Sequence, residues 1–184
     1  MMGDVLDDDL PQADPAIRTN YEAAVGRLIL AHNEVDYRLT TVIRFAIAKL
    51  GGDSGLHRLA GGMFAQRVDS LALLQAIPIN LYLGKIDCAQ LRELNEQRNI
   101  VAHGHFEQNP FDGSYNLIGK RKYATQQQWS ERQFPAERLD ELSGLLGNLA
   151  DTLRYVEACF CFDGVEVEEP DHGDGKDTAA GSLA

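Results

Sequence analysis

The chain has 184 residues and a formal net charge of −11 at pH 7. This length is sufficient for one domain with a proper hydrophobic core. An evenly spread charge of that size would argue against a nucleic-acid partner, but the acidic residues gather at the two ends. Residues 1–16 carry a net charge of −5 and residues 163–184 one of −6, which leaves 16 acids and 16 bases between them. The central part of the chain is formally neutral, so its charge does not exclude RNA.

The two acidic ends have the composition of solubilising, disordered segments. We therefore predict a disordered acidic leader over residues 1–15, a helical domain over residues 16–162 and a disordered acidic tail over residues 163–184. A second interpretation of the tail is that it mimics nucleic acid and occupies a basic cleft.

The cysteine content indicates a reducing compartment. The chain has an odd number of cysteines, namely Cys88, Cys159 and Cys161, and no signal peptide is recognisable. Together these features predict a cytoplasmic protein. The cysteine pair at 159 and 161 has no matching pair elsewhere, so we expect no metal site. The chain also lacks the glycine-rich loop motifs that bind nucleotide phosphates or dinucleotides, so we expect no cofactor. No apolar run approaches about twenty residues, which predicts that nothing spans a membrane.

The first predicted helix covers residues 15–50. Its apolar seam alternates in steps of four and three, as in a coiled coil. The seam consists of Leu28, His32, Val35, Leu39, Val42 and Ala46. A helix of that length, about 50 Å at 1.5 Å per residue, can serve a dimer as well as the internal core. We interpret His32 as a histidine that is satisfied in the core or at an interface.

Two further helices show the same periodicity. A glycine-rich loop follows the first helix, and a second helix is predicted over residues 63–76, before Pro78. The last helix begins near Pro135, because proline is favoured in a first helical turn. Its apolar stripe is the cleanest in the chain and is predicted to lie in the core. That stripe consists of Leu139, Leu142, Leu146, Leu149, Leu153, Val156 and Phe160.

A further helix, between these two, ends in a cluster of polar residues. Asp87 can cap its start, and Gly104 fits the position just past its end. Its apolar stripe consists of Leu91, Leu94 and Val101. Arg98 falls inside that stripe. A guanidinium there needs a partner or an aqueous cleft, because an unpaired buried charge is costly.

The residues Arg98-Asn99-x-x-x-His103 resemble the Arg-(polar)-x-x-x-His signature of HEPN domains, a nucleotide-binding family of prokaryotes and higher eukaryotes. The resemblance implies a mainly α-helical fold, an HEPN-like antiparallel helical bundle of four to five helices with a small inserted β-hairpin. HEPN proteins are often dimers, and many are metal-independent ribonucleases of toxin–antitoxin and antiviral systems. The expected partners are therefore RNA, a second copy of the chain, and an antitoxin or another defence-system protein.

By the same resemblance, three residues form a catalytic site for RNA cleavage at a dimer cleft. Arg98 stabilises the phosphate, His103 transfers protons, and Asn99 orients one of them, with a 2′,3′-cyclic phosphate as product. Arginine stays cationic and grips phosphate in a bidentate way, whereas histidine titrates near neutral pH. On an ideal helix, residues five apart point about 140° from each other. Either the reach of the arginine closes this gap, or each residue acts with its counterpart in a second subunit.

The segment after Gly104 changes periodicity and predicts a β-hairpin or arm over about residues 105–125. A strong turn signal at residues 109–113 separates its two strands. Adjacent basic and aromatic side chains can follow a phosphate backbone and stack a base. The predicted RNA-binding residues are His105, Lys120, Arg121, Lys122 and Tyr123. The alternative is a charged edge strand that resists aggregation.

Two other functions are open to the same residues. A non-catalytic HEPN-like module would bind nucleotide or RNA, or hold a dimer together, without turnover. In a purely structural cluster, Arg98 would pair with Glu34 or another buried acid. Asn99 would then bond to a loop, and His103 would cap its helix. A ribonuclease would cleave RNA, a binding module would bind RNA or nucleotide without cleaving it, and a structural cluster would do neither.

Overall fold

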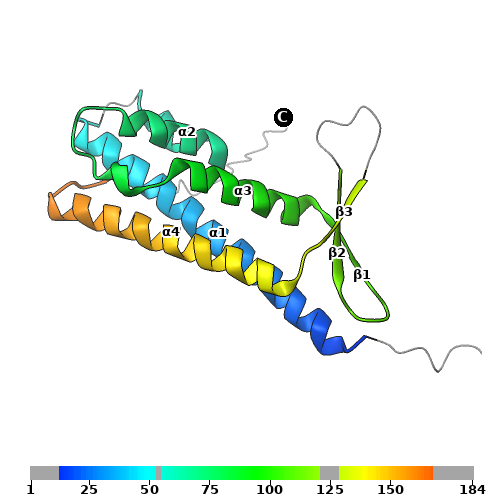
Figure 1. Ribbon diagram of the computed structural model, residues 1–184. Helices are drawn as coiled ribbons and strands as arrows, with labels where there is room; N and C mark the ends of the chain where they lie inside the picture. The colour runs from blue at the N-terminus through cyan, green and yellow to red at the C-terminus, as the bar shows by residue number, and fades with distance from the viewer. Residues whose placement is uncertain (1–12, 53–54, 121–128, 168–184) are drawn as a thin grey trace, which may run out of the picture.

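A computed structural model of the chain describes residues 13–52, 55–120 and 129–167 (Figure 1). In this part of the chain, four α-helices form the body and three short strands form an arm at one end. The elements are α1 (Pro15–Lys49), the 3₁₀ turn η1 (His57–Ala60), α2 (Phe64–Gln75), the 3₁₀ turn η2 (Leu83–Lys85), α3 (Cys88–His103), β1 (His105–Gln108), β2 (Tyr115–Lys120), β3 (Trp129–Gln133) and α4 (Ala136–Phe162). The predicted mainly α-helical architecture is confirmed.

Some of the predictions concern residues outside the described ranges. The predicted leader lies there up to residue 12, and the predicted tail from residue 168 onward. The predicted RNA-binding residues outside these ranges are Arg121, Lys122 and Tyr123. For Lys120 the structure gives the backbone alone, as the last residue of β2.

The helices α1 and α4 form the central pair of the bundle. α1 begins as predicted, because the Asp14 carboxylate accepts a hydrogen bond of 2.8 Å from the backbone N–H of Ala16 and Pro15 occupies the first turn. Every residue of the predicted seam of α1 is buried, and so is every residue of the predicted stripe of α4. The removal of these apolar side chains from water is the main force that holds the two long helices together.

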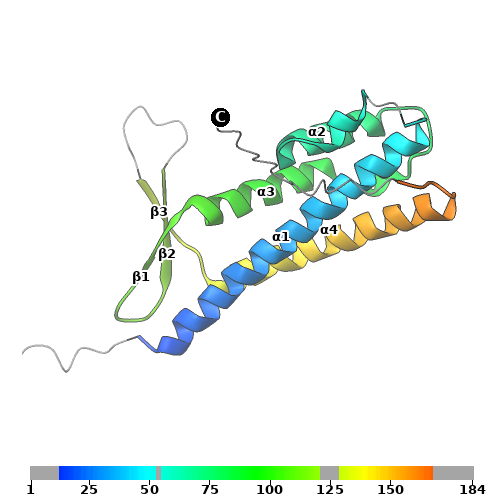
Figure 2. The same cartoon turned by 180° about the vertical axis from the view of Figure 1, so that it is seen from behind.

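Three of the helices run in one direction, and only α3 runs in the opposite direction (Figures 1 and 2). Three ion pairs between α1 and the α4 region show that α1 and α4 are parallel, because the residue numbers increase on both sides from one pair to the next. They are Arg27–Asp140, Glu34–Arg154 and Lys49–Asp163. The predicted antiparallel arrangement is therefore wrong for α1, α2 and α4. The reason is the connection after α1. At about 3.3 Å per residue, residues 50–63 are long enough to run back along α1, so that α2 starts beside its middle, where Phe64 contacts His32.

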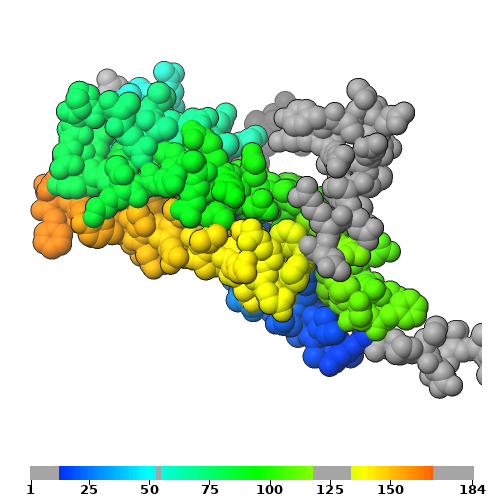
Figure 3. All heavy atoms as spheres, in the orientation of Figure 1, coloured from blue at the N-terminus to red at the C-terminus, as the bar shows by residue number. Residues whose placement is uncertain are grey.

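α3 carries the polar motif and is the helix that runs against its neighbours. The Asp87 carboxylate caps it and accepts hydrogen bonds from the backbone N–H groups of Ala89 (2.8 Å) and Gln90 (3.0 Å). The predicted apolar stripe of this helix is buried. Figure 3 shows α3 at the surface between α2 and α4, so the side of α3 that lies opposite its buried apolar stripe faces solvent.

The arm is a small antiparallel sheet with the strand order β1-β2-β3, at the end of the bundle where α3 ends and α4 begins. The predicted hairpin is confirmed as β1 and β2, with Phe106 opposite Leu117. The third strand, in which Arg132 pairs with Leu117, was not predicted. Its sequence, Trp-Ser-Glu-Arg-Gln, lacks the apolar alternation that identifies a strand.

Gly104 links α3 to β1 at a point that has no room for a side chain. Its φ of −77° and ψ of 159° are open to any residue, so space rather than conformation requires the glycine. An added Cβ would lie 2.1 Å from Cδ1 of Leu117 and 2.7 Å from the carbonyl oxygen of Ile100. We expect Gly104→Ala to lower the free energy of unfolding, measured by urea denaturation, by about 1–3 kcal/mol.

Gly144→Ala in α4 is the matched control for this change. A Cβ at Gly144 meets nothing within 4 Å, so alanine there is expected to be neutral or to stabilise by about 0.5–1 kcal/mol. Equal effects of the two substitutions would contradict the close packing of β2 on the end of α3.

Candidate functional site

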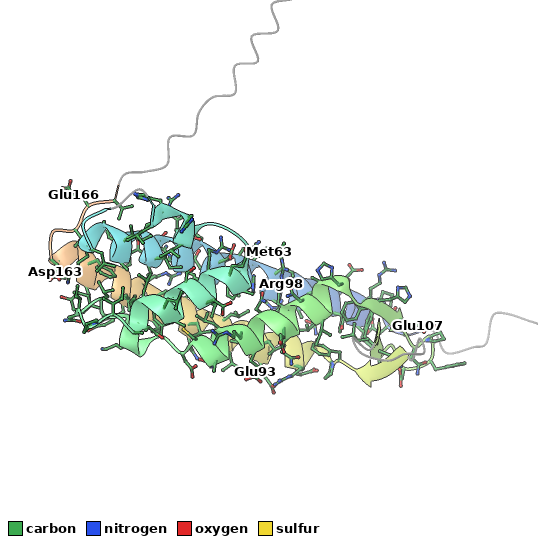
Figure 4. The ribbon with its side chains drawn as sticks, turned by 90° about the horizontal axis from the view of Figure 1, so that it is seen from above. Met63, Glu93, Arg98, Glu107, Asp163 and Glu166 are labelled. Carbon is green, nitrogen blue, oxygen red and sulfur yellow. The ribbon has the colours of Figure 1, made fainter. Side chains whose placement is uncertain are left out.

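Arg98 is half-buried on the side of α3 that faces the start of α2, near Met63 (Figure 4). Its Nη1 donates a hydrogen bond of 3.1 Å to Oδ1 of Asn99. Its Nε is buried and has no hydrogen-bond partner among the described residues. One side of the guanidinium is thus held by the neighbouring amide. Nη2 has no described partner either, and it is the nitrogen left for a phosphate, because the buried Nε is closed to a ligand from outside.

No carboxylate within the described ranges pairs with Arg98. Glu34, the acid considered for this role, instead accepts a hydrogen bond of 2.9 Å from Arg38. Asp36, on the same helix, pairs with Arg67 of α2. The structural alternative in which Arg98 pairs with Glu34 is therefore wrong. A guanidinium in this state can bind an anion from outside the chain.

His32 of α1 is buried close enough to Arg98 to be affected by its charge. Only 4 % of the residue is exposed, and its ring lies 4.7 Å from that of Phe64. Its Nε2 lies 3.2 Å from Oδ1 of Asn95, an atom that can only accept, so the proton of the neutral ring is on Nε2. Nδ1 then carries a lone pair, and this buried atom has no partner among the described residues. The predicted burial of His32 is confirmed, but only half of its hydrogen-bonding capacity is satisfied.

Three charged residues act on the pKa of His32: Asp36 of its own helix α1, Arg67 of α2 and Arg98 of α3. Burial lowers this pKa most, and the positive charge of Arg98 lowers it further. The hydrogen bond to Asn95 and the charge of Asp36 raise the pKa, whereas Arg67 lowers it. The net result is a pKa below the ordinary histidine value, so the neutral ring is favoured in the folded protein.

The lowered pKa of His32 predicts a loss of stability in acid. A histidine in the unfolded chain takes up a proton near pH 6.5, whereas native His32 resists protonation. The unfolded state therefore binds more protons, and the free energy of unfolding falls as the pH drops from about 6.5 towards the native pKa. His32→Leu should flatten this part of the curve, measured by urea denaturation from about pH 7.5 to about pH 5.5.

His57, which is exposed in η1, provides the control for the pH experiment. His57→Leu should leave the pH dependence of the unfolding free energy close to that of the wild type. If the wild type and His32→Leu lost stability in parallel over this pH range, His32 would not be the buried neutral group described above.

His103 is the last residue of α3 and is exposed at the base of the arm. Because Arg98 lies five residues earlier, the two side chains leave an ideal helix about 140° apart. No hydrogen bond joins them among the described residues, whereas Asn99 contacts Arg98 directly. Within one copy of the chain, the structure brings together Arg98 and Asn99, adds His32 and Asn95 from their surroundings, and leaves His103 on another face.

The rings of the arm dock against α1. Tyr115 of β2 lies parallel to Tyr21 of α1 with the ring centroids 3.9 Å apart. Phe106 meets the same tyrosine edge-on at 5.5 Å. One face of Tyr115 is thus covered within the protein, which favours a structural role for this ring. His105 is exposed on β1 and is accessible to a ligand.

In the described part of the chain, no group of three or more His, Cys, Asp and Glu side chains is placed to hold a metal ion. The cysteines are free thiols, and burial raises the pKa of the Cys88 thiol, which disfavours its thiolate. Among the same residues, no helix has the length and apolar character needed to cross a membrane. The polar groups gathered on the inner side of α3 are a guanidinium, two amides and an imidazole.

Comparisons of the chain with models of protein families, with curated proteins and with solved structures found no match in any of the three. The function of the chain is therefore inferred from the chemistry of α3 and its neighbours.

Proposed function

We propose that the chain is a metal-independent endoribonuclease of the HEPN type that acts as a homodimer. The observation that carries this proposal is the state of Arg98. Its guanidinium is half-buried, fixed by Asn99 on one side, and unpaired with any described carboxylate. A cation held in this way is prepared for a phosphate group, because its position is set before the ligand arrives.

Cleavage of RNA without a metal requires three events at one phosphodiester. The 2′-hydroxyl loses a proton, the 2′-oxygen attacks phosphorus, and the 5′-oxygen leaves with a proton, which produces a 2′,3′-cyclic phosphate. In this scheme Arg98 stabilises the charge that develops on the phosphate oxygens. His103, at the exposed end of α3, transfers protons to or from the reacting oxygens.

A second copy of the chain would supply the groups that one copy lacks. Arg98 and His103 of a single chain face different directions, so a cleft between two copies would place the arginine of one beside the histidine of the other. Two large side chains seven residues apart on α1 support a contact between copies. Leu30 is 70 % exposed and Tyr37 is 62 % exposed, and their spacing of two helical turns places them on one face of α1, where a second copy could dock.

The test of this proposal is incubation of the protein with a mixed pool of RNAs in EDTA. Cleavage that leaves 2′,3′-cyclic phosphate ends, by a protein whose mass in light scattering is that of a dimer, is the expected result. Products with 3′-hydroxyl ends would contradict the assigned chemistry. If several RNAs all remained uncleaved, the proposal of ribonuclease activity would be rejected.

A non-catalytic RNA- or nucleotide-binding module is the second candidate. It is favoured by the same divergence of Arg98 and His103, because a phosphate held at Arg98 on the inner side of α3 need not approach His103. This candidate predicts RNA affinity without turnover, and Arg98→Ala would weaken that affinity. The wider role in a toxin–antitoxin or antiviral system follows from the HEPN resemblance, as does an antitoxin or other defence-system partner, whereas the proposed cytoplasmic location follows from the cysteine content. Lys120, His105 and the basic residues that follow β2 are proposed to contact the RNA backbone.

A further inference from the structure

A pocket of about 320 Å³ lies near the end of the bundle farthest from the arm, where α4 ends (Figure 1). Its floor is apolar and includes the buried side chains of Leu74, Leu81 and Leu83. Two further apolar side chains that line it are exposed to water, Ile79 by 51 % and Tyr155 by 52 %. A volume of this size with a mainly apolar lining is typical of sites that bind small molecules.

The chain segment that forms one wall of the pocket is held in place from inside the bundle. Nε2 of Gln75 donates hydrogen bonds of 2.9 Å to the carbonyl oxygens of Leu83 and Ile86. Tyr82 has a φ of 57°, the one positive φ of a non-glycine residue in the described ranges, and its hydroxyl donates a hydrogen bond of 2.6 Å to Asp163. Such a strained conformation persists only where the surrounding contacts fix it. The pocket is therefore formed before a ligand arrives, which lowers the cost of binding.

The polar side chains left unused at the pocket are hydrogen-bond donors. Lys85 is exposed, its Nζ lies 4.2 Å from the centroid of the Tyr155 ring, and it pairs with no carboxylate among the described residues. Oδ1 of Asn80 accepts a hydrogen bond of 3.2 Å from the backbone N–H of Tyr82, which leaves Nδ2 of this exposed amide to donate. No Asp or Glu of the described ranges lines the pocket. The lining is thus complementary to a ligand that is apolar and carries a negative charge.

We propose that this pocket binds a small carboxylate with an apolar body. The carboxylate contacts Nζ of Lys85, and the apolar body covers Ile79 and Tyr155 and reaches the leucine floor. An ammonium above an aromatic ring keeps N–H groups for an acceptor, so the contact with Tyr155 does not compete with the ligand. Neither Arg98 nor His103 lines the pocket, and the inference does not rest on the proposed ribonuclease activity.

Octanoate is the probe, and 1-octanol is the neutral ligand of the same chain length. Each is titrated into ¹⁵N-labelled protein, and the backbone amide shifts in a ¹H–¹⁵N spectrum give both the place of binding and Kd. We expect octanoate to shift the amides of Gly84 and Lys85. Lys85→Met should raise the Kd for octanoate about tenfold, the effect of losing one hydrogen bond to a charged group that is open to water. The Kd for 1-octanol should stay within about twofold, because this ligand has no charge to pair.

Arg58→Met is the matched control for the loss of a charge. Arg58 is also exposed and has no acid partner among the described residues, but it does not line the pocket. This variant should bind octanoate like the wild type, whereas Ile79→Ser should weaken both ligands, because both cover the same apolar wall. Circular dichroism establishes that the variants are folded.

Three results would overturn the proposal. They are unshifted amides at Gly84 and Lys85, shifts scattered over exposed apolar side chains elsewhere in the chain, and a Kd for octanoate that is the same in Lys85→Met and Arg58→Met. None of these measurements uses RNA, so a failure of the ribonuclease proposal leaves their meaning unchanged.

Discussion

Replacing Arg98 by alanine is expected to lower kcat for RNA cleavage by about 10²–10³-fold, the usual effect of removing one preorganised donor from a developing oxyanion. The fold should survive, because the side chain is half-buried and forms no ion pair with a described residue. Single-turnover cleavage of a labelled RNA by the wild type and by Arg98→Ala, both checked by circular dichroism, measures the effect. Arg98→Lys should recover little, since an ammonium lacks the planar, rigid set of donors that Asn99 holds in place in the guanidinium.

Arg92→Ala is the matched control for this experiment. Arg92 lies six residues earlier on α3, is exposed, and pairs with Asp69 of α2 at 2.9 Å. Its removal costs at most the small energy of a surface ion pair and should leave kcat within about twofold of the wild type. Similar losses in Arg92→Ala and Arg98→Ala would indicate a general electrostatic effect and would contradict a specific phosphate site at Arg98.

The second large effect is expected in the core, at Phe160 near the end of α4. This side chain is fully buried, stacks on Phe45 at a centroid distance of 5.7 Å and meets Tyr82 edge-on at 5.6 Å. Phe160→Ala should lower the free energy of unfolding by about 3–5 kcal/mol, because it removes buried apolar surface and leaves a cavity. Urea denaturation followed by circular dichroism measures the loss.

Phe162 provides the control two residues further along the same helix. It is 94 % exposed, so Phe162→Ala should change the free energy of unfolding by less than about 0.5 kcal/mol. A comparable loss in both variants would mean that the end of α4 does not pack on α1 as described.

The helical part of the fold could be predicted from the sequence because local signals determine it. Asp87 caps α3 and α1 begins at Pro15 as predicted, and the apolar stripes of α1, α3 and α4 are buried as their spacing predicts. The directions of the helices could not be predicted in this way. Periodicity shows which face of a helix is buried but not how a long connection such as residues 50–63 returns along its neighbour.

The candidate site shows the same division between local and tertiary information. Arg98 was recognised because a charge interrupts an apolar stripe, and its contact with Asn99 is between adjacent residues. The partner of His32 was missed because Asn95 lies 63 residues away in the sequence. One signal was available: a histidine within a seam of apolar residues requires hydrogen bonds from another element. Gly104 was placed correctly at the end of its helix, but only the packing of Leu117 shows why glycine is needed there.

The most direct test of the central claim is the cleavage of one labelled RNA in EDTA by the wild type and by His103→Ala. Circular dichroism establishes that the variant is folded, and His57→Ala serves as the control for loss of an exposed histidine. The account predicts that the wild type and His57→Ala cleave the RNA to a 2′,3′-cyclic phosphate and that His103→Ala does not. Equal cleavage by all three proteins, or cleavage by none of them, would contradict a ribonuclease site at the end of α3.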